Sequence, residues 1–220
     1  MVAMAATRGK LDDLLIEDEQ FIEVRNDGIT VIHITAMYGH LEQIPAHLLT
    51  ANNLLRQCID GSTVLHYAAA NGQLHLIRKD ILSTENLSIR GQLKRTPFHW
   101  AARNGHLCQL PNELLSADNL LVKDRSHKTP LYLAARSGFL EQIPRNILTT
   151  ENLLRKANNG MSALEEAAHG RKANLNQLLG LNFENNEEVR AIVGEEWFKE
   201  NNILLKTYLP TTKIQDIDIF

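Results

Sequence analysis

The chain has 220 residues, of which 44% are hydrophobic and 22% are charged, and its formal net charge is -3. This balance excludes a disordered chain of low hydrophobicity and provides no overall attraction to nucleic acid. Its two cysteines, Cys58 and Cys108, exclude a disulfide scaffold and indicate a reducing compartment. No apolar run approaches the roughly 20 residues of a membrane span, and the opening MVAMAATRGK lacks the order of a secretory signal. We therefore expect a cytoplasmic protein that does not enter a membrane.

The first segment, residues 1–26, is predicted to be an N-terminal capping half-repeat. Its sequence AATRGKL, from Ala5 to Leu11, is a weakened copy of a phrase that recurs further along the chain. The segment is also rich in acidic side chains, which are Asp12, Asp13, Glu17, Asp18 and Glu19. A polar outer face suits a terminal unit, because that face meets water instead of another repeat.

Residues 27–180 are predicted to form five repeats, with the bounds 27–59, 60–92, 93–125, 126–158 and 159–180. The clearest copy of their shared phrase begins at Thr96 and reads TPFHWAARNGHL. Related phrases begin at residues 30, 63, 129 and 162, so successive copies start 33 positions apart. A constant period of this size is typical of a stacked-repeat architecture, in which each unit packs only against its neighbours.

Each phrase carries the signals of a short helix. Thr96 and Thr129 are each followed by proline, which places a hydroxyl at the N-cap and proline at the first helical position. A pair of alanines is small enough to let neighbouring helices approach closely. A glycine then ends the helix, because it can adopt a left-handed conformation; these residues are Gly39, Gly72, Gly105 and Gly138.

The pattern TPLHxAAxxGHL, repeated at this constant spacing, resembles the ankyrin repeat. The resemblance implies an all-α solenoid of stacked helix-turn-helix units, joined by short β-hairpin fingers, with a concave face and a cap at each end. It also implies that partners contact the fingers and the exposed positions of the first helix. The proline-bearing variant of the repeat found here is more similar to bacterial ankyrin proteins than to animal ones.

The second half of each repeat departs from that family. Proline at positions 45, 111 and 144 interrupts a segment in which the family has a continuous leucine-rich helix. Because proline lacks an amide hydrogen and clashes with the preceding turn, we expect a short second helix that opens near the proline. It would bury apolar residues such as Ile44 and Leu48, and it would end by Leu49, Leu82, Leu115 and Leu148.

A Ser or Thr follows this segment, with an Asn at the third position after it, as in Thr50 and Asn53. We expect one further helical turn here, N-capped by the hydroxyl, with asparagine in place of the usual acid of a capping box. This turn would carry four leucines inward, namely Leu54, Leu87, Leu120 and Leu153.

The fifth copy is degenerate, because Glu165 and Glu166 replace the histidine and the apolar residue that follows it. Residues 181–220 leave the repeat pattern and are predicted to form a C-terminal helical cap and tail, with helices over 185–192 and 195–208. The sequence leaves open whether this segment only caps the stack or has a function of its own. It also leaves open whether the alternating residues 214–220 form a strand or an acidic-hydrophobic peptide.

Catalytic chemistry finds no support in the sequence. His33, His66 and His99 occupy the same repeat position, so we expect each of them to satisfy backbone hydrogen bonds. The other histidines lack the spacing of metal ligands such as HxxxH. The chain has no nucleophile elbow, phosphate-binding loop or paired carboxylates tied to a cleft, so we expect no enzymatic activity, no cofactor and no metal.

The remaining candidate is a surface. Carried over from the ankyrin pattern, the candidate partner-binding residues are Tyr38, Asn71, Arg95, Arg103, Asn104, Lys128 and Arg136. The cations among them belong to repeats three and four, with Lys94, Arg125 and His127 beside them, whereas Trp100 is expected to pack between repeats. Cations stacked in register would form a strip that repels itself and favours an acidic partner.

The leading hypothesis is a monomeric, non-enzymatic module that binds a protein or peptide with an acidic segment on the concave face of repeats two to four. One alternative is nucleic-acid binding through the basic strip of repeats three and four. The net charge and the lack of exposed aromatic residues between the cations argue against it. Another alternative is a targeting arm for a regulator or effector whose activity involves the C-terminal segment 181–220.

Overall fold

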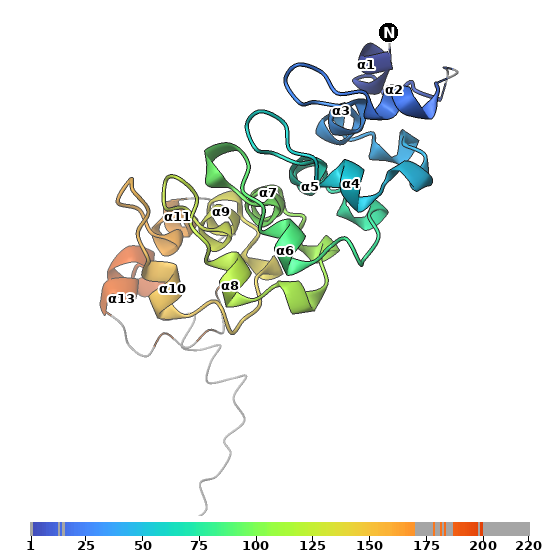
Figure 1. The fold of residues 1–220 in the computed structure, drawn as a ribbon. Coiled ribbons are helices and arrows are strands. Elements are labelled where there is room, and N and C mark those ends of the chain that lie inside the picture. Colours follow the sequence, from blue (N-terminus) through green and yellow to red (C-terminus); the bar gives the residue numbers. More distant parts are fainter. Residues whose placement is uncertain are drawn as a thin grey trace, which may run out of the picture.

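The computed structural model describes residues 2–12, 14, 16–169, 178, 181, 183, 187–197 and 199. These residues form an elongated stack of helical units (Figure 1). One row of helices runs the length of the stack and consists of α3 (Val31–Tyr38), α5 (Val64–Ala70), α7 (Pro97–Asn104), α9 (Pro130–Ser137) and α11 (Ala163–His169). A second row holds shorter helices, which are α4 (Ala51–Leu54), α6 (Thr84–Leu87), α8 (Ala117–Leu120) and α10 (Thr150–Leu154). The all-α repeat solenoid predicted from the sequence is confirmed.

The first row begins and ends where its sequence signals predict. Thr96 and Thr129 are the N-caps of α7 and α9, and proline occupies the first turn of both helices. At the other end, Gly105 and Gly138 adopt φ values of 76° and 84° as C-caps. An L-residue is strained at such positive φ, so the glycines terminate these helices for the expected conformational reason.

The expected short second helix appears only as a single 3₁₀ turn after the proline of repeats one and three, at η2 (Ala46–Leu48) and η6 (Asn112–Leu114). In each of repeats one to four, a further 3₁₀ turn lies before the proline position, at η1 (Leu41–Gln43), η3 (Leu74–Leu76), η5 (Leu107–Gln109) and η7 (Leu140–Gln142). The residue before the proline is extended, with ψ of 127° at Ile44 and 145° at Leu110, because proline disfavours the helical region for its predecessor. Repeat two has Arg78 at the proline position, yet Ile77 keeps a ψ of 138°, so the break does not depend on proline alone.

The apolar residues of this segment are nevertheless placed as predicted. Ile44, Leu48 and Leu49 are all buried, because the two 3₁₀ turns bring the same positions to the core that a short helix would. The four leucines of the one-turn helices, Leu54, Leu87, Leu120 and Leu153, are completely buried.

The asparagines of the one-turn helices act differently from the expected capping-box partner. The hydroxyl of Thr50 accepts from the backbone N of Asn53 as predicted, but Nδ2 of Asn53 donates to the carbonyl of Leu48 at 2.8 Å. Asn86, Asn119 and Asn152 make the same bond to the equivalent carbonyls of their own repeats. Each asparagine therefore ties its one-turn helix to the turn that precedes it.

Hairpin loops, here called fingers, connect the repeats and project from the first row of helices (Figure 1). In each finger the backbone N of the first residue donates to the carbonyl of the fifth at 2.8–3.0 Å. The fingers are numbered one to five and span residues 25–29, 58–62, 91–95, 124–128 and 157–161. In finger three, the short segment η4 (Gln92–Lys94) forms the tip.

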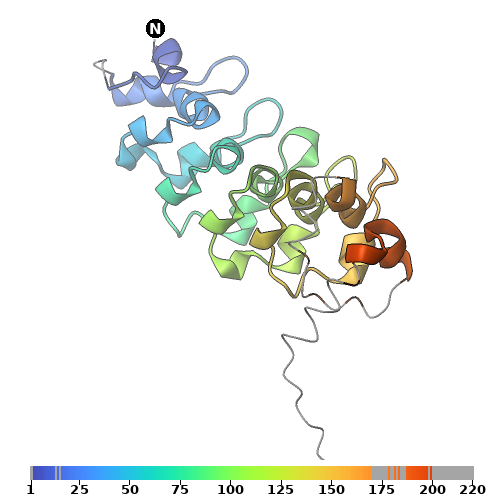
Figure 2. The same ribbon diagram turned by 180° about the vertical axis from the view of Figure 1, so that it is seen from behind.

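Both ends of the stack are covered by further helices. At the start, α1 (Val2–Ala6) and α2 (Asp18–Ile22) pack against α3. At the other end, α13 (Glu187–Val193) lies beside α11, as Figure 2 shows from behind. Gly194 follows α13 with a φ of 85°, which agrees with the predicted interruption. The expected helix over 195–208 continues beyond the described residues, and the alternating residues 214–220 lie outside them. No helix in the described part of the chain has the length and apolar composition that a membrane crossing requires.

A glutamine closes two of the boundaries between repeats and also holds the N-terminal segment, and sequence analysis did not single it out. Nε2 of Gln109 donates to the carbonyl of Gly72 at 2.6 Å, and its Oε1 accepts from the backbone N of Leu74 at 3.1 Å. Gln43 holds the N-terminal segment in the same way, and Gln142 holds repeat three. Repeat two carries Leu76 at this position, so the boundary between repeats one and two lacks the clamp.

The same boundary is looser in a second respect. At Gly72 and Gly105, the ring of His106 or Phe139 from the next repeat lies against the position that a Cβ would occupy. At Gly39 no atom lies within 4 Å of that position, because repeat two has Gln73 instead of a ring. Oε1 of Gln73 is buried and has no hydrogen-bond partner among the described residues.

Candidate interaction surface

The repeated histidines are structural, as predicted. In repeat two, Nδ1 of His66 accepts from the backbone N of Thr63 at 3.0 Å, and Nε2 donates to the carbonyl of Arg95 at 3.1 Å. His99 makes equivalent bonds, to Thr96 and to the carbonyl of Lys128, whereas Nε2 of His33 bonds to the carbonyl of Arg56, just before finger two. Burial lowers the pKa of His66 and of His99 to about 4, so both rings are neutral near pH 7. These side chains connect a helix to a finger and offer no free catalytic group.

The fourth and fifth repeats replace this histidine with other polar side chains. Tyr132 occupies the position in repeat four, and its hydroxyl bonds to Glu166 and Asn159. In repeat five, Glu165 and Ser162 form a reciprocal capping box, in which the backbone N of Ser162 donates to the Glu165 carboxylate at 2.6 Å. Glu165 therefore caps the start of α11.

Two of the seven candidate residues use their amides to join repeats. Nδ2 of Asn71 donates to the carbonyls of Ala36 and Met37 at 2.8 and 3.0 Å. Nδ2 of Asn104 donates to the carbonyl of Ala70 at 2.7 Å. Both side chains are exposed, but their donors are already engaged with the C-terminal end of the preceding helix. Their observed contacts support the stack.

The expectation that Arg95 is displayed to a partner is wrong. Arg95 is only 8% exposed, and its Nε lies 3.0 Å from Oδ2 of Asp124, which is also buried. Its guanidinium lies 5.3 Å from the ring centre of Trp100. Trp100 itself is half-buried and packs against the core, as predicted. Because Asp124 belongs to the next finger, Arg95 joins fingers three and four from the inside.

The other candidate cations remain accessible. Arg103 of α7 is exposed, with its guanidinium 5.8 Å from the Trp100 ring centre, where a cation–π contact holds it. Arg136 of α9 is exposed, and its Nε lies 3.8 Å from Glu166. Lys128 is half-buried, with Nζ 5.3 Å from the Tyr132 ring centre. Because α7 and α9 pack side by side, Arg103 and Arg136 belong to one surface. Tyr38 is 53% exposed but belongs to repeat one, two repeats before α7.

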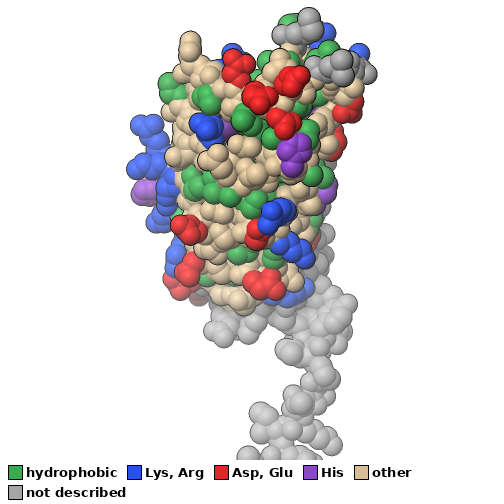
Figure 3. Space-filling model, turned by 45° about the vertical axis from the view of Figure 1, so that its right-hand side comes forward, with side chains coloured by type: hydrophobic (Ala, Val, Ile, Leu, Met, Phe, Trp, Pro, Cys, Tyr) green, Lys and Arg blue, Asp and Glu red, His purple; other side chains and the backbone are tan. Residues whose placement is uncertain are grey.

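Further basic residues lie in fingers three and four or directly before them. Their exposed side chains are Arg90, Lys94, Lys123, Arg125 and His127. Figure 3 shows Lys, Arg and His side chains gathered along one edge of the molecule. The acidic residue within these fingers, Asp124, is buried and engaged with Arg95. The accessible surface here is therefore strongly positive although the whole chain carries a formal net charge of -3.

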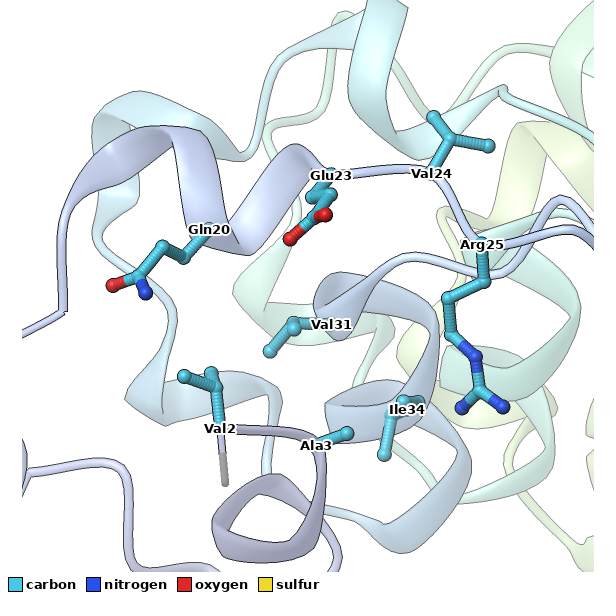
Figure 4. A pocket seen from close by; sticks show the side chains of 8 residues that line it. All are labelled: Val2, Ala3, Gln20, Glu23, Val24, Arg25, Val31 and Ile34. Atoms are coloured by element: carbon cyan, nitrogen blue, oxygen red, sulfur yellow. The ribbon is translucent and has the colours of Figure 1, made fainter.

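A hollow of about 400 Å³ lies at the N-terminal end of the stack. Val2 and Ala3 of α1 face Val31 and Ile34 of α3 across it, with Glu23 above them (Figure 4). Its lining contains no nucleophile and no pair of acid and base groups, so it lacks the residues of a catalytic site. Within the described part of the chain, no three His, Cys, Asp or Glu residues are arranged to hold a metal ion.

Comparison with known families gives one finding. A family model described as "Ankyrin repeats (3 copies)" matches the chain over residues 2–79, 46–110 and 98–189. These overlapping matches extend from the first helix to α13. No curated protein sequence matches the chain significantly.

Proposed function

The chain belongs to the ankyrin-repeat family, and we propose that it binds an acidic segment of a partner protein on the concave face of repeats two to four. Ankyrin repeats generally mediate protein–protein interaction, and proteins built from them are typically non-enzymatic. The partner's charge is inferred from the surface of repeats three and four, where accessible cations outnumber accessible acids.

Arg103 and Arg136 are the residues best placed for this contact. They occupy the same position in adjacent helices, and both are exposed. Arg103 rests on Trp100, and Arg136 lies near Glu166, so both side chains are partly oriented before a partner arrives. Such preorganisation supports binding, because less side-chain entropy is lost on association. A carboxylate can accept two hydrogen bonds from one guanidinium, which suits an acidic segment.

A charge-reversal experiment tests the proposal. The probe is a fluorescein-labelled peptide of alternating aspartate and serine, titrated by fluorescence anisotropy. Arg103→Glu with Arg136→Glu should weaken its binding at least tenfold while the circular dichroism spectrum stays unchanged. Lys79→Glu with Arg145→Glu is the matched control, because it makes the same charge change at equivalent, exposed positions of the outer turns of repeats two and four.

Each outcome of this titration bears on the proposal. Selective weakening by the first double variant supports it, whereas equal binding by both double variants sinks it. A single-stranded oligodeoxynucleotide serves as the competing probe. If it binds more tightly than the peptide, and if its affinity falls steeply with salt, the surface is a nucleic-acid site instead.

We also propose that the described residues after 180 seal the end of the stack. The support is that α13 packs on α11 and that Trp197 and Phe183 are buried, with ring centres 5.9 Å apart. Truncation after Gly180 tests this role. A loss of thermal stability without loss of peptide binding is expected, whereas loss of binding in a chain of unchanged stability would favour a functional role for the segment.

A further inference from the structure

The tip of finger three has a backbone that its residues disfavour. Leu93 and Lys94 have φ values of 59° and 57°, and the backbone N of Arg95 donates to the carbonyl of Gln92 at 3.1 Å. Two central residues with positive φ define a type I′ turn, for which Asn-Gly is the preferred pair. A leucine and a lysine occupy these positions instead.

Finger four repeats this departure. His127 has a φ of 58°, whereas the equivalent position is glycine in fingers one, two and five, at Gly28, Gly61 and Gly160. Fingers three and four are therefore the two in which a large side chain replaces the glycine. Leu93 is 44% exposed and Lys94 and His127 are exposed, so these side chains add little to the core. Strain that persists without a packing benefit points to function.

The two fingers are held to each other in three ways. The backbone N of Arg125 donates to the carbonyl of Leu93 at 2.8 Å. Nη1 of Arg90 donates to the carbonyls of Lys94, in finger three, and Lys123, directly before finger four, at 3.1 and 2.9 Å. The buried pair of Arg95 and Asp124 joins their bases. Fingers three and four thus present their tips as one preorganised unit.

The tips combine apolar and positively charged groups. Leu93 is followed by Lys94 in its own finger and bonds through its carbonyl to Arg125 of finger four, which also carries His127. Ile59, in neighbouring finger two, is 85% exposed, which makes it the most exposed large hydrophobic residue in the described part of the chain. An acidic peptide with apolar side chains matches both properties. A nucleic-acid backbone would use the cations but would leave Leu93 and Ile59 without a partner.

We propose that fingers three and four bind the partner through an apolar residue flanked by carboxylates. Leu93 contacts the apolar side chain, and Lys94, Arg125 and His127 contact the carboxylates on either side. The proposal rests on the proposed function, in which the partner is acidic. It adds the requirement that the acidic segment also carries an apolar side chain. Leu93 and Lys94 thereby act as specificity-determining residues.

The test exchanges the tip of finger three for the residues that its turn prefers. The probe is a fluorescein-labelled peptide of alternating aspartate and leucine, compared with the aspartate–serine peptide. The wild-type chain should bind the leucine peptide at least fivefold more tightly. Leu93→Asn with Lys94→Gly should keep or raise the melting temperature and should weaken binding of the leucine peptide about tenfold. If the tip served folding alone, the variant would not bind the leucine peptide more weakly while its melting temperature stayed the same or rose.

A matched control is available at the other end of the molecule. Val24→Asn with Lys10→Gly removes an exposed apolar side chain that lines the N-terminal hollow and one exposed positive charge of the N-terminal segment, and it should leave both affinities unchanged. The proposal is overturned if the finger variant binds the leucine peptide like the wild type, if the serine peptide binds as tightly as the leucine peptide, or if neither peptide binds.

The two proposals fail separately. If the serine peptide binds as tightly as the leucine peptide and its binding still depends on Arg103 and Arg136, the fingertip proposal is wrong and the proposed function stands. If the leucine peptide depends on Leu93 but not on Arg103 and Arg136, the fingers bind the partner and the concave face does not.

Discussion

Arg95 and Asp124 form an ion pair inside the molecule, between two fingers. Nε of Arg95 lies 3.0 Å from Oδ2 of Asp124, and the side chains are 10% and 1% exposed. The other oxygen of Asp124 accepts from the backbone N of Ser126 and of Lys128, at 2.7 and 3.0 Å. The Asp124 carboxylate thus accepts the backbone hydrogen bonds that shape finger four, and it also balances the charge of the buried Arg95 guanidinium.

We predict that Arg95→Met lowers the free energy of unfolding by about 3 kcal/mol, because it leaves a buried carboxylate without its counter-charge. Urea denaturation monitored by circular dichroism measures the change. The double variant Arg95→Met with Asp124→Asn should recover part of the loss, because it removes the uncompensated charge. A single variant that unfolds at the wild-type urea concentration would show that the pair contributes nothing.

Gln109→Leu is predicted to lower the free energy of unfolding by about 1–3 kcal/mol, since buried polar groups lose their partner. The change leaves the carbonyl of Gly72 and the backbone N of Leu74 without the side chain that satisfies them. The reverse change, Leu76→Gln, places a glutamine at the boundary that lacks the clamp and should raise stability by about 1 kcal/mol or less. Chemical denaturation of both variants decides the matter, and an unchanged midpoint for Gln109→Leu would contradict the prediction.

His127→Gly is predicted to raise the free energy of unfolding by about 0.5–1 kcal/mol, because glycine adopts the observed φ of 58° without a clash at Cβ. The gain is partly offset by the greater freedom of glycine in the unfolded chain. Differential scanning calorimetry measures it as a higher melting temperature. Ser126→Gly, at a neighbouring position without positive φ, provides the comparison, and a lower melting temperature for His127→Gly would refute the argument from strain.

Stability should fall as the pH is lowered from about 6.5 to about 4. Burial lowers the pKa of His66 and of His99 to about 4 in the folded chain, from 6.5. The unfolded state therefore binds more protons in this window, and each histidine removes on the order of 3 kcal/mol of stability across it. Asp60 near His66 and Asp124 near His99 oppose the effect of burial, while Arg95 and Arg90 add to it at His99.

Denaturation midpoints measured at intervals between pH 7 and pH 4 test this dependence. Since burial also lowers the pKa of His33, His99 and His106, His66→Gln should flatten the profile only in part, even if the variant is less stable at every pH. A wild-type profile that is level across the window would show that both rings can be protonated without loss of their bonds.

The first row of helices could be predicted from sequence because its signals are local. Thr96 caps α7, Pro97 opens it and Gly105 ends it, and each of these roles depends on residues within one or two turns. The second half of each repeat could be predicted only in part. A short helix and a pair of 3₁₀ turns both bury Ile44, Leu48 and Leu49, so the apolar pattern could not distinguish the two structures.

The candidate surface was harder to predict, because contacts with other residues of the chain decide whether a side chain is exposed and free to bind. Arg95 resembles a finger residue in position, but Asp124 of the next finger draws it inward. Asn104 is exposed as expected, yet its amide reaches the carbonyl of Ala70 in the preceding repeat. The positions of Lys94 and His127 did carry a signal. Both align with glycines in other fingers, and a residue with a Cβ at a glycine position indicates a backbone held against its preference.

The missing glutamine between repeats one and two has a consequence for how the chain opens. In a linear array, each unit is held only by its neighbours, so a boundary with weaker contacts separates first. Leu76 and Gln73 leave the boundary after Gly39 without the glutamine clamp and without a ring against the glycine, although Asn71 and Gln73 still donate hydrogen bonds across it. Amide hydrogens of α3 should therefore exchange with solvent sooner than those of α7 and α9. Repeat one would then detach as a cooperative unit while the basic fingers stay folded.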